Sequence, residues 1–151
     1  MIALAHFLIG ALIGMSLDNF LFIAVLAFIS HFILDAIPHL DQGSFKKKKE
    51  DWTSRDWFLV FVDVVIGASL ALYFAIRFEF WPIAVGVAFA ILPDVIDTLS
   101  WMFNARRKPF FKQFHEIHDK IGFKLTRELL WLGVILEVAV ILSILSILLF
   151  V

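Results

Sequence analysis

The chain has 151 residues, of which 62% are hydrophobic, with a mean hydropathy of +0.93 and a formal net charge of −1. A soluble domain needs less apolar surface than this to bury its core, so we expect a single membrane domain over residues 1–151. Because the sequence has no cysteine, disulfides and thiolate metal sites are excluded. Any metal must therefore be held by His, Asp or Glu side chains.

Apolar segments predict an all-α bundle of about five transmembrane helices, at residues 2–16, 19–37, 56–77, 81–103 and 128–150. The first is short for a membrane span and would fit as a tilted or partly interfacial helix. It begins "MIALAHFLIG", without a basic region or a small-residue cleavage site, so we expect a retained helix. Gly10 and Gly14 are four residues apart, as are Gly67 and Ala71, a spacing that lets helices approach closely.

The basic residues predict the orientation. Twelve of the thirteen Lys and Arg residues fall in two segments, 42–55 and 104–127, and only Arg77 lies elsewhere. A two-helix hairpin separates these segments, so both lie on one face, which the positive-inside rule makes cytoplasmic. We therefore expect a multi-pass protein of the cell (inner) membrane, with its N-terminus inside and its C-terminus outside.

Ionisable side chains from several segments collect near this cytoplasmic face. Such groups are costly in lipid, so they either have partners or mark a working site. The stretch "SHFILDAIPHLD", residues 30–41, places His31, Asp35 and His39 four residues apart. They share one helix face if Pro38 does not turn the chain too early.

The other segments add nitrogen and oxygen ligands. Asp94 and Asp97 share a face at i, i+3 in "ILPDVIDTL", and His6 and Asp63 come from the first and third segments. Inward side chains from facing helices form the metal sites of helical bundles. His115 and His118 lie in the second basic segment, on the same side of the membrane.

Two short matches predict an internal repeat of two hairpins. "HFLIG" at 6–10 resembles "DVVIG" at 63–67, and "LDAI" at 34–37 resembles "PDVI" at 93–96. The repeat would run about an axis along the membrane normal. It would match His6 with Asp63 and Asp35 with Asp94 around a shared centre.

Four motifs resemble those of the small membrane-bound metal-dependent hydrolases of the YdjM type. The chain shows "AH" at His6, "SHFILD" at 30–35, "LPDVID" at 92–97 and "HEIH" at 115–118. That family carries "GH", "SHxxAD", "LPDID" and "HRGxTHS"; here the order is rearranged, and the glycine and serine of the last motif are missing. The run "HFILDAIPH" is also similar to the His-Asp-His pattern of zinc-dependent phospholipase C. The resemblance implies a metal site that includes His6, His31, Asp35, Asp94 and Asp97, with His115 and His118 as further metal residues.

The second basic segment also allows a different interpretation. His115 and His118 can belong to the polar face of an amphipathic interfacial helix, in which case neither is a ligand. The apolar side of that helix would consist of Phe110, Phe111, Phe114, Ile117 and Ile121.

Two classes of function follow from these residues. In a hydrolase, one or two divalent ions, Zn²⁺ or Mn²⁺, would activate water against a phosphoester of a membrane lipid or other amphiphile, with Asp97 or His39 as general base. In a transport or scaffold protein, buried Asp and His would form a metal or proton path that Glu137 extends across the bilayer. A chain this short would then need to form a homo-oligomer. No nucleic-acid-binding module is visible, so nucleic acid is not an expected partner.

Overall fold

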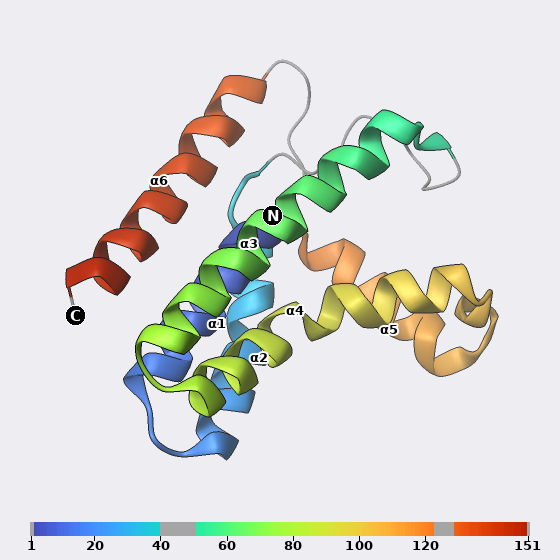
Figure 1. Cartoon of the computed structure of the whole chain (residues 1–151). Coiled ribbons are helices and arrows are strands. Elements are labelled where there is room, and N and C mark those ends of the chain that lie inside the picture. The colour runs from blue at the N-terminus through green and yellow to red at the C-terminus, as the bar shows by residue number, and fades with distance from the viewer. Residues whose placement is uncertain (1, 40–50, 123–128, 151) are drawn as a thin grey trace.

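The computed structural model describes residues 2–39, 51–122 and 129–150, and its regular elements are helices (Figure 1). They are α1 (Ala3–Ser16), α2 (Phe20–Ala36), α3 (Ser54–Arg77), α4 (Phe80–Met102), the short 3₁₀ helix η2 (Ala105–Arg107), α5 (Pro109–Ile121) and α6 (Leu130–Phe150). The all-α class is confirmed. Each of the five predicted apolar segments corresponds to one helix, and α5 is a sixth α-helix within the second basic segment.

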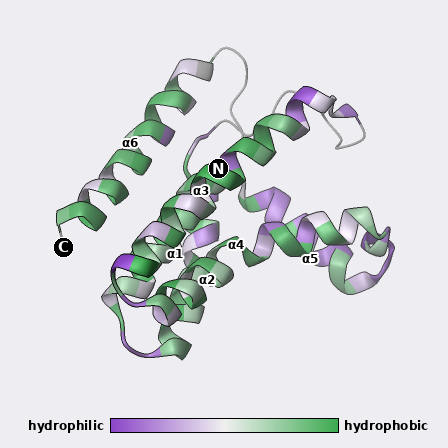
Figure 2. Cartoon of the chain, in the orientation of Figure 1, coloured by the Kyte–Doolittle hydropathy of each residue, from purple (hydrophilic) through white to green (hydrophobic). Residues whose placement is uncertain are grey.

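Three helices are long and apolar enough to cross a membrane, namely α3, α4 and the part of α6 from Trp131 to Phe150. The helices α1 and α2 are also apolar but shorter, with 14 and 17 residues. Large apolar side chains lie exposed on the outer surfaces of these helices, and Figure 2 shows hydrophobic residues along most of their length. Apolar surface of this extent marks a contact with lipid or protein, and together with the three long helices it indicates a membrane protein.

Local signals explain where α2 and α3 begin and where α2 ends. The side-chain oxygen of Asn19 accepts hydrogen bonds from the first backbone N–H groups of α2. Thr53 and Asp56 form a capping box at the start of α3. Pro38 disfavours helical backbone in the residue before it, so α2 ends at Ala36.

The helices α1 and α4 pack backbone to backbone and run antiparallel. A Cβ atom added to Gly10 would lie 2.7 Å from the carbonyl oxygen of Gly86, and one added to Gly86 would collide with the carbonyl oxygen of Gly10. One turn further along α1, Gly14 meets the backbone of Pro82 in the same way. Only glycine fits this approach, which confirms the close packing expected from the spacing of Gly10 and Gly14.

This packing separates a polar end of the bundle from an apolar end. The apolar core includes Leu8 in the middle of α1, Phe74 and Leu148 toward the ends of α3 and α6, and Ile83 near the start of α4. The antiparallel register then carries His6, one turn before Gly10, toward the second half of α4. The buried polar residues among the described side chains are His6, His31, Asp35, His39, Asp97, Ser100 and Glu137.

The second half of α4 departs from the direction of the first, and α5 returns beside it (Figure 1). Pro93 lies inside α4 and is the expected cause of the bend, because proline removes one hydrogen bond from the helix and crowds the preceding turn. The bend brings Asp94 and α5 next to the end of α2, where the predicted ligands lie.

Candidate metal centre

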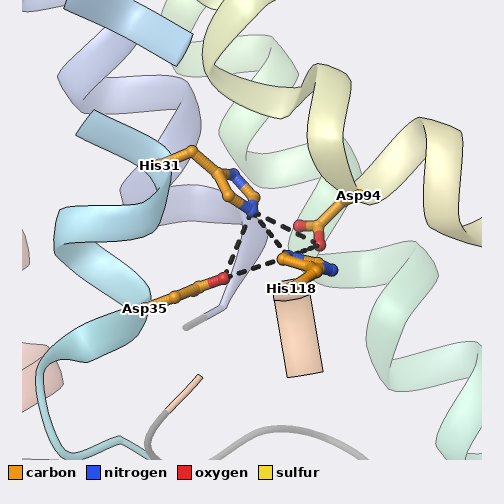
Figure 3. A group of neighbouring side chains, drawn as sticks. All are labelled: His31, Asp35, Asp94 and His118. Atoms are coloured by element: carbon orange, nitrogen blue, oxygen red, sulfur yellow. Dashed lines mark hydrogen bonds and ion pairs between the residues drawn. The ribbon is translucent and has the colours of Figure 1, made fainter. Parts of the chain in front are cut away.

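Four side chains from three helices converge at the polar end of the bundle (Figure 3). His31 and Asp35 come from consecutive turns of α2, Asp94 from α4 just after Pro93, and His118 from α5. One potential ligand atom from each residue lies within 4.8 Å of the other three. We call these four residues the His–Asp cluster; all four are predicted metal ligands, and the group can hold a metal ion.

Distances within the His–Asp cluster match those of a metal site. Nε2 of His31 lies 3.2 Å from Oδ2 of Asp35, 3.7 Å from Oδ1 of Asp94 and 3.0 Å from Nε2 of His118. Nε2 of His118 lies 3.3 and 3.6 Å from the same two carboxylate oxygens. Ligands held tetrahedrally at about 2.0–2.1 Å from a zinc ion stand about 3.3 Å from one another. The cluster therefore has the size and the ligand types of a divalent metal site.

The second ring nitrogen of His31, Nδ1, fixes the orientation of the ring. Nδ1 of His31 lies 2.7 Å from the backbone carbonyl oxygen of Ala90, in the turn of α4 that precedes Pro93. A carbonyl oxygen only accepts hydrogen bonds, so this contact requires that Nδ1 donates. In the neutral ring, Nε2 then presents its lone pair to the cluster, as metal-bound histidines require.

His6 lies beside the His–Asp cluster and contacts two of its members. Its ring is fully buried and stacks on the ring of His31, with centroids 4.1 Å apart. Nε2 of His6 is 3.2 Å from Oδ1 of Asp35, the oxygen that faces away from His31 and His118. Neither ring nitrogen of His6 makes a hydrogen bond of good geometry within the described part of the chain. His6 thus borders the group of four without being one of its members.

The carboxylates of the cluster favour the protonated form of His118. Burial is the largest single effect on His118 and lowers its pKa, but the hydrogen bond to Asp35 and the negative charges of Asp94, Asp35 and Asp97 together raise the pKa above its ordinary value. The carboxylates therefore attract a proton to this position. A divalent cation would neutralise the same two carboxylates, and ligand histidines would release their protons to it.

A second cluster of polar side chains lies one turn later along α4 and one turn earlier along α5. Oδ1 of Asp97 is 2.8 Å from Nδ1 of His115, and Oδ2 of Asp97 is 2.7 Å from Nη2 of Arg106. The pairs Asp97–His115 and Asp94–His118 are offset by three residues on each helix, as expected for antiparallel helices in contact. Asp97 and His115 therefore lie beside the His–Asp cluster and bind each other. Arg106 begins the basic run 106–108, and nothing in the sequence marks it as a partner of Asp97.

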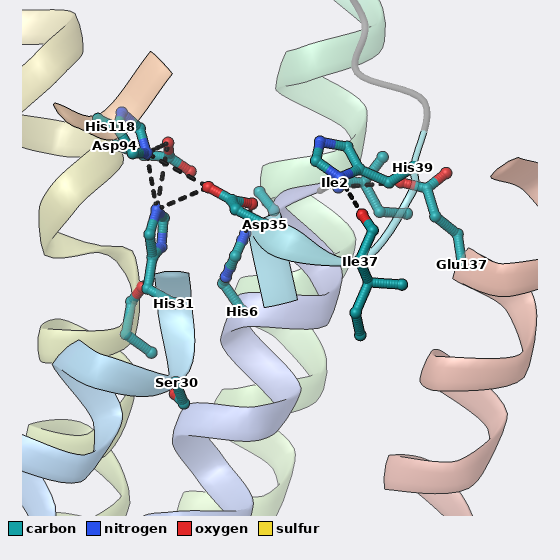
Figure 4. Close-up of polar contacts among 12 residues, drawn as sticks. Ile2, His6, Ser30, His31, Asp35, Ile37, His39, Asp94, His118 and Glu137 are labelled. Carbon is teal, nitrogen blue, oxygen red and sulfur yellow. Dashed lines mark hydrogen bonds and ion pairs between the residues drawn. The ribbon is translucent and has the colours of Figure 1, made fainter. Parts of the chain in front are cut away.

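His39 lies away from the cluster, which corrects the expectation that it shares a helix face with His31 and Asp35. The helix ends before Pro38, and Nδ1 of His39 lies 2.7 Å from the carbonyl oxygen of Ile37. Figure 4 shows His39 beside Ile2 and Glu137, on the other side of Asp35 from the cluster.

Asp63 and Glu137 contact the start of α1. Oδ2 of Asp63 accepts a hydrogen bond from the backbone N–H of Ala3 at 2.6 Å, and Oδ1 accepts one from Leu4 at 3.1 Å. Oε1 of Glu137 accepts one from Ile2 at 3.3 Å. These acids take the place of an N-terminal cap, because Ile2 has no side-chain acceptor. The sequence shows that Ile2 cannot cap α1, but not which distant side chains replace the cap.

The structure thus places the predicted residues in three groups. The His–Asp cluster has His6 at its border, Asp97 and His115 form a neighbouring pair, and Asp63 and His39 lie near the start of α1 and the end of α2. Comparisons of the chain with protein-family models, with curated proteins and with solved structures found no match.

Proposed function

We propose that this chain is a membrane-embedded metal-dependent hydrolase that cleaves a phosphoester of a lipid or other amphiphilic substrate at the cytoplasmic membrane face. The observation that carries the proposal is the His–Asp cluster, in which two imidazole nitrogens and two carboxylates from three helices lie at metal-ligand spacing. Nitrogen and oxygen ligands of this kind suit Zn²⁺ or Mn²⁺. We propose either metal, with one ion in the cluster.

The cluster is open on one side, as a catalytic site must be. The side chain of Asp94 is 44% exposed, whereas those of His31 and Asp35 are buried. A phosphate group can therefore reach the ligands from the side of Asp94. When bound, a divalent ion lowers the pKa of a water molecule and neutralises the oxygens of a phosphoester.

His115 is the proposed general base. Because its Nδ1 donates to Asp97, its Nε2 is the nitrogen left to accept a proton from the attacking water. Its side chain is 35% exposed, so water can reach it. Water would add its oxygen to phosphorus, the phosphoester bond would break, and the proton would pass through His115 to the leaving alcohol. Asp97, held by Arg106, would orient His115, a role that replaces the expected base function of Asp97 or His39.

The distribution of charge supports the proposed orientation. We propose that α1–α4 and α6 all lie in the inner membrane, with the N-terminus in the cytoplasm. Arg55 lies in the first turn of α3, and Arg106 and Arg107 follow α4, all at the end of the bundle that carries the cluster. Arg77 ends α3 at the opposite end. Under the positive-inside rule, the cluster faces the cytoplasm, where membrane lipid would be both substrate and partner.

Two features of the sequence agree with this proposal. Asp35 and Asp94, which the proposed hairpin repeat matches, are both members of the cluster. The motif residues that carry the resemblance to YdjM-type hydrolases also gather there, because the cluster, His6 and the Asp97–His115 pair lie side by side. Membership of that family is therefore part of the proposal.

The rival transport function has less support. Glu137 would have to extend a polar path across the bilayer, but its side chain hydrogen-bonds Ile2 at the start of α1, the same end that holds the cluster. Toward the other end of the helices, the described core residues Phe74, Ile83 and Leu148 are apolar and buried. An ion or proton path needs polar partners along its length.

Purified protein assayed on phospholipid and polyprenyl-phosphate substrates tests the proposed function. The wild type should hydrolyse at least one of them, lose the activity with a chelator and regain it with Zn²⁺ or Mn²⁺. Asp35→Asn should be inactive, whereas Glu116→Gln, a change of an exposed acid on α5, should keep full activity. Equal activity of wild type and Asp35→Asn would overturn the proposal.

A further inference from the structure

The helix α5 is attached to the bundle mainly through polar contacts. None of its 13 residues, all of which the structure describes, is buried. Its links to the bundle include the contacts of His118 with Asp35 and Asp94, and that of His115 with Asp97. The least exposed apolar residues of α5, Phe111 and Phe114, are only half-buried, so apolar packing against the bundle fixes this helix less firmly than a buried face would.

The outer surface of α5 carries an apolar stripe, and a run of positive charge stands directly before the helix. Phe110, Ile117 and Ile121 are 66%, 57% and 37% exposed, and their spacing puts them on one helix face. Residues 105–121 carry five basic residues (106, 107, 108, 112 and 120) against two acidic residues (116 and 119), a formal charge of 5 − 2 = +3. The surplus comes from 106–108, because α5 itself carries two residues of each sign. A strongly amphipathic helix with lysines beside its apolar face is typical of helices that lie in the lipid–water interface.

The neighbouring end of α4 continues the apolar surface toward the membrane. Met102, the last residue of this helix of membrane-spanning length, and Phe103, which follows it, are 61% and 74% exposed. α5 follows after only the short η2 turn and runs back beside the second half of α4, so both helices lie at the end of the bundle where α4 stops. A lipid surface is therefore the partner within reach, and the positive charge selects anionic headgroups.

We propose that α5 docks on the anionic lipid surface of the membrane that holds the chain, and that this contact keeps His118 in the His–Asp cluster. Phe110 and Ile117 insert between acyl chains near the headgroups, while Lys112 and Lys120 meet the negative charge. Because α5 also carries His118, lipid contact and metal binding stabilise the same position of the helix and must strengthen each other. The inference rests on membrane insertion of the chain but not on hydrolysis.

Spin labels on single cysteines test the docking directly, because the chain has no cysteine of its own. Labels at 110 and 117 report the apolar stripe, and labels at 112 and 116 report the polar side of the same helix. In vesicles of phosphatidylcholine with phosphatidylglycerol, the first pair should be accessible to oxygen dissolved in lipid and the second pair to a water-soluble nickel complex. Labels at 110 and 117 that are accessible from water would overturn the proposal. So would labels shielded from both reagents, which would indicate a protein partner or a second copy of the chain.

Metal affinity tests the coupling. The full chain should bind Mn²⁺ several-fold more tightly in vesicles that contain phosphatidylglycerol than in phosphatidylcholine alone. Lys112→Gln with Lys120→Gln should remove this difference, while Arg77→Gln, a charge change at the opposite end of α3, should keep it. The same Mn²⁺ affinity in both vesicles would overturn the coupling. Neither readout uses hydrolysis, so a failure here is distinct from a failure of the proposed activity.

Discussion

Nδ1 of His31 and the backbone carbonyl oxygen of Ala90 lie 2.7 Å apart, joining α2 to the turn of α4 that precedes Pro93. Two things needed by a metal site depend on this turn. The hydrogen bond points Nε2 of His31 at the cluster, and the bend at Pro93 sets the position of Asp94. Pro93 thus positions the ligands of the site, although it is not a ligand itself.

Replacing Pro93 with alanine should weaken metal binding without unfolding the chain. A regular helix at this point would move both the Ala90 carbonyl and Asp94 relative to His31. Loss of such supporting contacts typically lowers metal affinity by about 10–100-fold. Metal titration of Pro93→Ala measures the effect, with Pro109→Ala as control, because Pro109 begins α5 and bends no helix. Equal affinities of the two variants would show that the bend does not position the site.

The carboxylates of Asp35 and Asp94 should act as one unit. If they share an ion, Asp35→Asn or Asp94→Asn alone should remove most of the metal affinity, and the double variant should lose little more. Isothermal titration with Zn²⁺ on the four proteins of the double-mutant cycle gives the coupling. Additive losses in binding free energy would mean that the two carboxylates do not bind the same ion.

Replacing Asp63 tests whether this residue caps α1 or binds the metal. Asp63→Ala removes two hydrogen bonds to the start of α1, so it should reduce the free energy of unfolding by about 1–2 kcal/mol. Its metal content should equal that of the wild type. Denaturation in detergent and metal analysis of the same sample test both statements, and loss of bound metal from a folded Asp63→Ala protein would restore Asp63 to the ligand set.

Close packing of α1 against α4 should make Gly86 intolerant of any side chain. Gly86→Ala forces the backbones apart, and such overpacking costs about 1–3 kcal/mol of stability. Gly122→Ala is the matched control, because the nearest atom to an added Cβ there lies 3.6 Å away, an ordinary contact. Thermal unfolding of both variants tests this, and equal melting temperatures would contradict the packing.

The fold was largely accessible from the sequence because membrane helices have a strong signal in apolar length. The glycine spacing in α1 also predicted a close helix contact, since few other residues permit one. The spacing of His31 and Asp35 predicted two ligands on one face, because both lie well inside a helix. His39 was misplaced because the effect of Pro38 begins before the proline itself and ended α2 at Ala36.

Other parts of the site could not be predicted because they depend on contacts between distant segments. Nothing in the sequence around Asp63 distinguishes a ligand from a cap for α1, which lies 60 residues away along the chain. Asp94 contacts His118 in the cluster, and Asp97 contacts His115. Which aspartate meets which histidine depends on how α5 lies against α4. Helical periodicity places both aspartates on one face but does not say which one meets His118.

Metal analysis of the purified protein tests the central claim, that the His–Asp cluster binds a divalent ion. After equilibration with Zn²⁺ or Mn²⁺ and removal of free metal, the wild type should retain about one equivalent. At a hundredfold excess over Kd, bound metal should stabilise the fold by about 2.7 kcal/mol. His31→Ala should retain none and melt like the chelated wild type, and Asp94→Asn, at the exposed edge of the cluster, gives a second variant should the first not fold. A wild type that retains no metal, or a folded His31→Ala protein that retains as much as the wild type, would contradict the account.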